Sequence, residues 1–238
     1  MENKHKVYNL IILDESGSMQ SIKKTIINGF NEVVQTIKSV ALQYPEQEHS
    51  VTFISFNTSG FKKIHENSKI EMLKQIDEQF YQPNGGTPLF DAMGVSFFNL
   101  NRIIEKENPT NYNVLVTILT DGEENSSKEH SAQSIKAMIE DFKLKNWTFT
   151  YIGANHDVDL FASRISINNV MKFETNEEDM QRMFMRDRNA RMNYSKKIRG
   201  FEDVSGDYFQ QPENEEDLPI DEEKKPKSKS FWKKFFGE

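Results

Sequence analysis

Short apolar runs alternate with longer segments of helical periodicity along most of this chain. The run "KVYNLIIL" (6–13) has little polar alternation, as expected of a strand buried on both faces. Residues 21–42 then repeat apolar side chains at helical spacing. Strands that alternate with helices of this length form a parallel sheet covered on both faces. The sequence therefore predicts a doubly wound α/β domain.

The rest of the pattern predicts a mostly parallel central sheet of about six strands, flanked by helices. Further strands are expected at 49–57, 112–120, 146–153 and 168–174. The turn "TSG" leads into 61–67, which is expected to be an antiparallel partner at the sheet edge. Helices are expected around 69–76, after Pro88 at 89–106, at 129–144, at 157–165 and roughly at 176–195.

Length and composition limit the class of protein. A chain of 238 residues has room for one large domain and an appendage. The absence of cysteine excludes disulfides, thiolate metal sites and cysteine nucleophiles. The apolar run before Asp14 is too short for a signal peptide or a membrane span, so we expect a cytoplasmic protein.

Charge is distributed unevenly, and this predicts the domain organisation. Residues 201–223 hold ten acids and no Lys or Arg, and residues 224–238 hold six Lys and one Glu. Residues 1–200 are therefore nearly neutral, so no attraction for nucleic acid is expected. We expect a globular domain at 1–200, a disordered acidic-then-basic linker at 201–230 and a short aromatic and lysine-containing motif at 231–238.

The terminal motif "FWKKFFGE" leaves several alternatives open. A short helix would place its four aromatic residues on one face: Phe231, Trp232, Phe235 and Phe236. Such a segment could dock on a protein partner, contact an anionic membrane weakly, pack on its own domain or remain disordered. The acidic stretch 213–223 could instead offer a Glu to a metal site on its own domain, which would make the tail autoinhibitory.

Polar side chains gather where three predicted elements meet one edge of the sheet. Asp14, Ser16 and Ser18 follow the first strand, Thr87 lies in the "NGGTP" loop, and Asp121 directly follows the strand 112–120. Oxygen ligands suit Mg²⁺, Mn²⁺ or Ca²⁺ and argue against zinc. Taken alone, "DESGSM" could also be a helix cap and the two glycines a tight turn.

Together these elements resemble the von Willebrand factor A (vWA) domain, a Rossmann-like fold. The resemblance rests on DxSxS, on a Thr in "GGTP" and on "TDG" after a buried strand, and it covers about residues 6–195. It implies a metal-ion-dependent adhesion site. Ser16 and Ser18 would bind the metal directly, Thr87 directly or through water, and the two acids mostly through water. "DESGSM" and "YIGANHD" resemble stand-alone bacterial vWA proteins in particular.

The resemblance implies a binding module rather than an enzyme. With both acids acting through water, the cation would keep an open position for an Asp or Glu of a protein partner. The family further suggests a bacterial multiprotein assembly, for example one with an AAA+ ATPase. Glu123 and His156 are candidates to contact the partner beside the metal, although a solvated loop also explains them.

Two other functions remain as alternatives. Asp14 could be the nucleophile of a Mg²⁺-dependent phosphohydrolase. However, the haloacid-dehalogenase pattern has a second acid where this chain has Ser16, and no phosphate-binding P-loop sequence is present. The chain could also be a membrane-associated adaptor that acts through its C-terminal tail.

The last predicted helix combines four methionines with four arginines. We expect Phe184 and the methionines, Met180, Met183, Met185 and Met192, to face the core. The arginines are expected on a solvated face, since acids interrupt them: Arg182, Arg186, Arg188 and Arg191.

Overall fold

Six strands form a single sheet in the order β3-β2-β1-β4-β5-β6. The computed structural model describes residues 4–210. All neighbouring strands are parallel except β2 and β3, which form an antiparallel hairpin at one edge. This confirms the predicted sheet. The strands are β1 (His5–Asp14), β2 (Gln47–Asn57), β3 (Gly60–Lys69), β4 (Tyr112–Thr120), β5 (Trp147–Gly153) and β6 (Asn169–Lys172).

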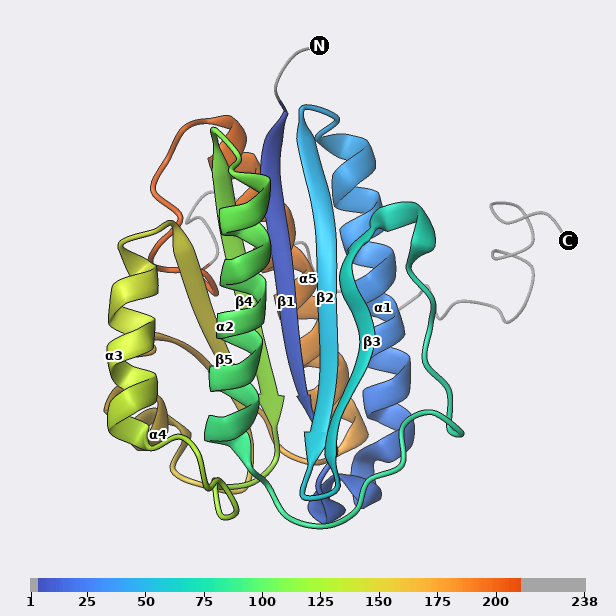
Figure 1. Cartoon of the computed structure of the whole chain (residues 1–238). Helices are drawn as coiled ribbons and strands as arrows, with labels where there is room; N and C mark the ends of the chain where they lie inside the picture. The colour runs from blue at the N-terminus through green and yellow to red at the C-terminus, as the bar shows by residue number, and fades with distance from the viewer. Residues whose placement is uncertain (1–3, 211–238) are drawn as a thin grey trace, which may run out of the picture.

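Helices cover both faces of the sheet, as Figure 1 shows. In that view α2, α3 and α4 lie in front of the strands, and α1 and α5 lie behind them. The helices are α1 (Lys23–Gln43), α2 (Leu89–Glu107), α3 (Ala132–Lys143), α4 (Val158–Arg164) and α5 (Glu177–Arg199). Short 3-10 turns occupy η1 (Gly17–Ile22) and η2 (Ile70–Met72).

The helix predicted around 69–76 is wrong beyond η2. Its backbone N–H groups bond to side chains of other segments instead of to their own turn. The N–H of Lys74 donates to His65 Nε2 at 3.2 Å, and the N–H of Ile76 donates to Asn31 Oδ1 at 2.9 Å. These bonds fix residues 73–76 in an extended path toward the edge of the sheet where β1 ends. Tertiary contacts thus override a weak helical pattern.

Side chains of the central strands alternate between two apolar layers. Leu10 and Ile12 of β1 pack with α2 and α3, and Ile11 and Leu13 pack with α1 and α5. Both layers are fully buried, because each face of the sheet has its own helices. Helices packed on both faces hold the sheet in position, so the ends of β1 and β4 are fixed relative to each other.

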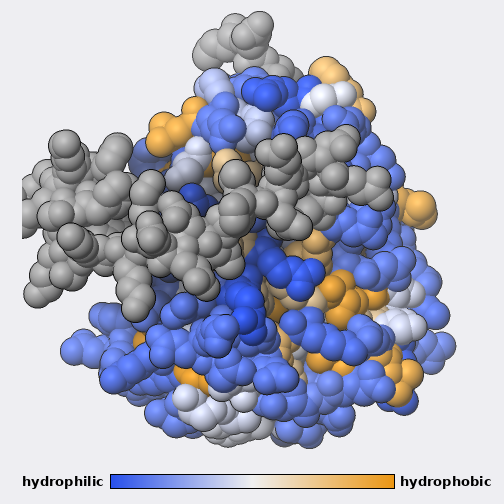
Figure 2. All heavy atoms as spheres, turned by 180° about the vertical axis from the view of Figure 1, so that it is seen from behind, coloured by the Kyte–Doolittle hydropathy of each residue, from blue (hydrophilic) through white to orange (hydrophobic). Residues whose placement is uncertain are grey.

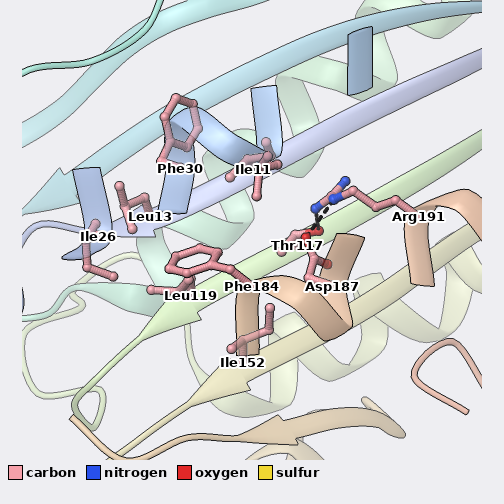
Figure 3. Close-up of a pocket in the computed structure, with 11 residues that line it drawn as sticks. Ile11, Leu13, Ile26, Phe30, Thr117, Leu119, Ile152, Phe184, Asp187 and Arg191 are labelled. Atoms are coloured by element: carbon pink, nitrogen blue, oxygen red, sulfur yellow. Dashed lines mark hydrogen bonds and ion pairs between the residues drawn. The ribbon is translucent and has the colours of Figure 1, made fainter. Parts of the chain in front are cut away.

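A buried ion pair joins α5 to the sheet. Arg191 is only 3% exposed; its Nε donates to Asp187 Oδ2 and its Nη2 donates to Thr117 Oγ1 on β4, both at 2.7 Å. Figure 3 shows this group beside a small pocket of about 20 Å³. The expectation that Arg191 lies on a solvated face is therefore wrong. Its helical position faces the sheet, and Asp187 four residues earlier neutralises it.

Residues 201–210, here called the strap, fold back on the domain. Tyr208 is buried; its N–H donates to Asn169 Oδ1 at 3.0 Å and its hydroxyl donates to Asp187 Oδ1 at 3.3 Å. Thr148 Oγ1 donates to the Val204 carbonyl. The strap was expected to begin the linker, but it packs on the same face of the sheet as α5. The rest of the predicted linker and the motif 231–238 lie outside the described residues.

The described surface is mostly hydrophilic when seen from behind the view of Figure 1 (Figure 2). Among the described residues, none of the helices has the length and apolar character that crossing a membrane requires. Phe201, directly after α5, is 96% exposed and adopts a left-handed backbone with φ of 57°.

Candidate functional site

The candidate site lies at the edge of the sheet where β1 and β4 end, the lower edge in Figure 1. Asp14 is the last residue of β1, and Asp121 follows the last residue of β4. The two strands are parallel neighbours, paired from Lys6–Tyr112 to Leu13–Leu119. The topology thus brings together two carboxyl groups that lie far apart in the sequence.

Hydrogen bonds connect the two acids to the serines between them. Ser18 Oγ donates to Asp121 Oδ1 at 2.6 Å, and the hydroxyls of Ser16 and Ser18 lie 3.1 Å apart. Asp14 is 0% exposed and accepts from the Ser16 N–H at 2.7 Å and from Thr120 Oγ1 at 2.6 Å. Ser18 itself is exposed. The four predicted oxygen-bearing residues therefore form one continuous group that reaches the surface.

Thr87 belongs to the same group. A Cβ built on Gly122 would lie 3.6 Å from Ser18 Oγ and 3.9 Å from Thr87 Oγ1, so both hydroxyls face this glycine. Thr87 is buried. Its N–H donates to Asn125 Oδ1 at 2.9 Å, and its carbonyl accepts from the Asn125 N–H at 3.2 Å. The structure thus brings all five predicted site residues to one place.

The loop that carries Thr87 is held against the first turn. The Gly17 N–H donates to the Gly85 carbonyl at 2.9 Å, and Gly85 has a φ of 69°, which favours glycine. The Asn84 N–H donates to the Glu15 carbonyl at 2.9 Å. The glycines of "NGGTP" therefore make a tight turn, as one alternative predicted, and this turn also positions Thr87.

Glu15 is an important residue that the sequence reasoning did not single out. It is 1% exposed, and its carboxylate accepts from Ser55 Oγ and the Gln82 N–H, both at 2.6 Å, and pairs with Lys62. It therefore ties the first turn to β2, β3 and the Thr87 loop. Its place between Asp14 and Ser16 was the only signal in the sequence, and nothing local shows that it is buried.

Burial makes the two acids costly to ionise. It raises the pKa of Asp14 to about 6; bonds from Thr120 and Ser16 oppose this rise, and the charge of Asp121 adds to it. Burial also raises the pKa of Asp121, although the Ser18 bond opposes the rise. Among the described residues, neither acid forms an ion pair with a Lys or Arg.

The family comparison agrees with this geometry. The sequence model of the von Willebrand factor type A domain matches residues 10–198, most of the chain. The chain belongs to the VWA family. VWA domains are generally protein-interaction modules. A comparison with curated proteins found no match.

Several solved structures are similar to this chain at low sequence identity. The pilus adhesin SpaC from Lactobacillus rhamnosus GG, in its open conformation, is 12% identical with a TM-score of 0.56. The match covers 79% of this chain and 30% of the SpaC chain. Proximal thread matrix protein 1 from the mussel byssus is 14% identical with a TM-score of 0.49, covering 76% and 45%. The SpRpn10 VWA domain is 9% identical with a TM-score of 0.46, covering 75% and 93%. This chain thus spans less than half of the first two.

The predicted partner-contacting residues of this VWA domain have different environments. Glu123 is exposed beside Gly122. His156 is half-buried; its Nδ1 donates to the Ala154 carbonyl at 2.5 Å and its Nε2 accepts from the Tyr151 hydroxyl at 3.1 Å. His156 is thus held by its own loop. The other candidates, Phe231, Trp232, Phe235 and Phe236, lie outside the described residues.

The donor set of this VWA site fits a hard divalent cation. Within the part of the chain that the structure describes, no group of three or more His, Cys, Asp or Glu side chains is placed to hold a metal. Two carboxylates and the hydroxyls of Ser16, Ser18 and Thr87 meet instead, and oxygen donors of this kind suit Mg²⁺. Asp14 and Asp121 are buried without a cationic side chain from residues 4–210 beside them, so a bound cation would compensate their charges.

Proposed function

We propose that this VWA domain is a metal-dependent protein-binding module that captures a carboxylate of a protein partner. The contact between Ser18 and Asp121 supports the proposal, because it places an exposed hydroxyl in line with a buried acid that lacks a cationic partner. Mg²⁺ is the proposed cation, with Mn²⁺ or Ca²⁺ as alternatives.

The residues of the chain have distinct proposed roles. Ser16, Ser18 and Thr87 would hold the cation, and Asp14 and Asp121 would balance its charge from behind the hydroxyls. A bound divalent cation supplies an electrophilic position at which a partner carboxylate can replace water. Glu15 and Asn125 act as positioning residues, because they fix the two loops that carry the hydroxyls.

We propose binding rather than catalysis for this site. Both carboxylate oxygens of Asp14 accept hydrogen bonds from within the domain, and the residue is fully buried. A nucleophile must reach its substrate, so this placement does not favour the phosphohydrolase alternative. A phosphatase assay with Mg²⁺ tests this choice. The proposal would be contradicted if the protein hydrolysed phosphate esters with Mg²⁺ and Asp14→Asn abolished this activity.

The cellular setting belongs to the proposal as well. We propose a cytoplasmic bacterial multiprotein assembly, with an AAA+ ATPase among the candidate partners. The resemblance of "DESGSM" and "YIGANHD" to stand-alone bacterial vWA proteins supports this setting. The tail could add a second contact, to a protein or weakly to a membrane, and two tethered weak contacts can give useful avidity.

Metal titration and partner capture together test the proposed function. Calorimetry should show Mg²⁺ binding to the wild-type protein and to Gln20→Ala, an exposed neighbour of Ser18 on η1. Ser16→Ala and Asp121→Ala should bind no Mg²⁺, and Thr87→Ala should bind it more weakly. In pull-downs from native lysate, the captured partners should disappear with EDTA. Identical partners with Mg²⁺ and with EDTA would refute the proposal.

A further inference from the structure

The loops that adjoin the candidate site carry acids but no Lys or Arg, and Lys62 of the neighbouring strand β3 pairs with one of these acids, Glu15. Six segments adjoin this edge of the sheet: 14–22, 57–60, 82–88, 121–127, 154–157 and 173–176. None of their residues is Lys or Arg, and their acids are Asp14, Glu15, Asp121, Glu123, Glu124, Asp157 and Glu174. An excess of negative charge around a binding site favours partners with positive charges and disfavours partners with negative charges.

Some of these acids are engaged within the domain and others face outward. Glu15 pairs with Lys62, and the carboxylate of Glu124 accepts from the N–H groups of Phe90, Ser126 and Ser127 at 2.7–2.8 Å. Three of these acids are exposed: Glu123, Asp157 and Glu174. The first basic residue after Asp121 in the β4–α3 loop is Lys128.

Of the three exposed acids, Glu123 lies closest in sequence to the site. It directly follows Gly122, which lies beside the hydroxyls of Ser18 and Thr87. Burial raises the pKa of the Tyr151 hydroxyl, and the charges of Asp14 and Glu123 raise it further. No ion pair within the described residues involves Glu123. Its exposed carboxylate is therefore available to a group that approaches the hydroxyl of Ser18.

We infer that the site selects a partner whose carboxylate is flanked by basic residues. This inference rests on the proposed function. The charges of Asp14 and Asp121 offset those of a divalent cation, so the loaded centre carries no net formal charge to attract an acidic segment from a distance. Glu123 and the outer acids then repel acids beside the captured carboxylate and attract Lys or Arg within a Debye length of about 8 Å.

The same selectivity disfavours the chain's own acidic stretch. Residues 213–223 contain seven acids and no Lys or Arg. Such a segment would bring its neighbouring acids against Glu123 as soon as one Glu approached the site. An external basic-flanked carboxylate therefore suits this surface better than autoinhibition by the tail.

Synthetic peptides with one Glu each can test the inference on the full-length protein. Three peptides place Lys, Ser or Asp on both sides of the Glu, and a fourth replaces the Glu of the Lys peptide by Gln. Binding is measured by fluorescence anisotropy with Mg²⁺ and with EDTA, and the Mg²⁺-dependent part is compared. We expect the Lys-flanked Glu peptide to bind about threefold to tenfold more tightly than the Asp-flanked one, as two surface charge pairs allow.

Charge reversal at one position separates this inference from the proposed function. Glu123→Lys should remove or reverse the order of the peptides while Mg²⁺ dependence persists. Glu71→Lys, an exposed acid at the opposite edge of the sheet, should leave the order unchanged. Two results would overturn the inference but not the proposed function. In the first, Mg²⁺-dependent binding is as tight or tighter for the Asp-flanked peptide than for the Lys-flanked one. In the second, Glu123→Lys leaves the order of the peptide affinities unchanged. Absence of Mg²⁺ dependence for every peptide would overturn the proposed function, and the inference with it.

Discussion

Ser18 Oγ donates a 2.6 Å hydrogen bond to Asp121 Oδ1, across 103 positions of the sequence. This contact joins the first turn of the domain to the end of the strand next to β1. It holds an exposed hydroxyl and a buried carboxylate in one place before any ligand arrives.

Asp121→Asn should have opposite effects on stability with and without metal. The amide removes a buried charge whose pKa burial raises, so the metal-free protein should gain about 1 kcal/mol of unfolding free energy at pH 7.5. The wild-type protein should gain stability as Mg²⁺ is added, because a ligand of the folded state stabilises it, and the variant should not. Thermal unfolding at several Mg²⁺ concentrations measures both effects. A variant that Mg²⁺ stabilises as much as the wild type would contradict this prediction.

Glu15→Gln should weaken Mg²⁺ binding although Glu15 is not a proposed ligand. The change removes the charge that pairs with Lys62 and weakens the bond from the Gln82 N–H, so the Thr87 loop loses its fixed position. Residues that position ligands typically change metal affinity by about tenfold or more. Calorimetric titration measures the affinity, with Glu66→Gln on exposed β3 as the matched control. Unchanged affinity in a folded Glu15→Gln protein would refute the positioning role.

Arg191→Met should destabilise the fold by about 3 to 5 kcal/mol, because it leaves Asp187 buried without its partner. Adding Asp187→Leu should recover most of the loss, since the apolar pair needs no charge compensation. Arg182→Met removes only exposed ion pairs and should leave the free energy of unfolding nearly unchanged. Urea unfolding measures each variant. A double variant no more stable than Arg191→Met would show that the ion pair is not the source of the loss.

The strap should be part of the folding unit. Tyr208→Ala should cost about 3 to 5 kcal/mol, as removal of a buried aromatic side chain does. Phe201→Gly should instead be neutral or stabilising, because Phe201 is exposed and its left-handed backbone favours glycine. Denaturant unfolding should also show a loss on truncation after residue 200 and none after residue 210. Equal stability of the two truncated proteins would contradict this assignment.

His49 should make the fold sensitive to acid. Burial, together with the charges of Arg191 and His5, lowers its pKa to about 4. The unfolded chain therefore binds a proton near pH 6.5 that the folded protein takes up only near pH 4, so stability falls as the pH drops through this window. The full effect is about 3 kcal/mol from the size of the shift. His49→Gln should lack this loss.

Asp14 acts in the opposite direction in nearly the same pH range. Its raised pKa means that protonation below pH 6 removes a destabilising charge from the folded state. The His49 effect must therefore be measured as the difference between wild type and His49→Gln, by urea unfolding from pH 7 to pH 4. A constant difference across this range would contradict the prediction.

The fold could be predicted from the sequence because its signals are local and repeated. The buried runs of β1 and β4, the helical period of α1 and α2, and the turn before β3 each identify an element without knowledge of the others. The parallel order then follows from the alternation of strands and helices. The family motif at Asp14, Thr87 and Asp121 added the location of the site.

Long-range contacts decided what local patterns could not. Residues 73–76 lost their predicted helix because Asn31 and His65 take their backbone N–H groups. Arg191 was expected in solvent, since acids interrupt the arginines of this helix. Its burial depends on Thr117 and Asp187 facing it in the fold. A sequence gives the chemistry of each side chain, whereas burial and partners depend on which distant segments meet it.

The chain by itself thus specified an α/β sheet and five oxygen-bearing side chains at one of its edges. Only the tertiary structure showed that Glu15 fixes their loops through its pair with Lys62, that 201–210 belong to the domain and that loops without Lys or Arg meet around the site. The physical reason is that ionisation, hydrogen bonding and selectivity depend on distances of a few ångströms between residues far apart in the polymer. Those distances exist only once the sheet has formed.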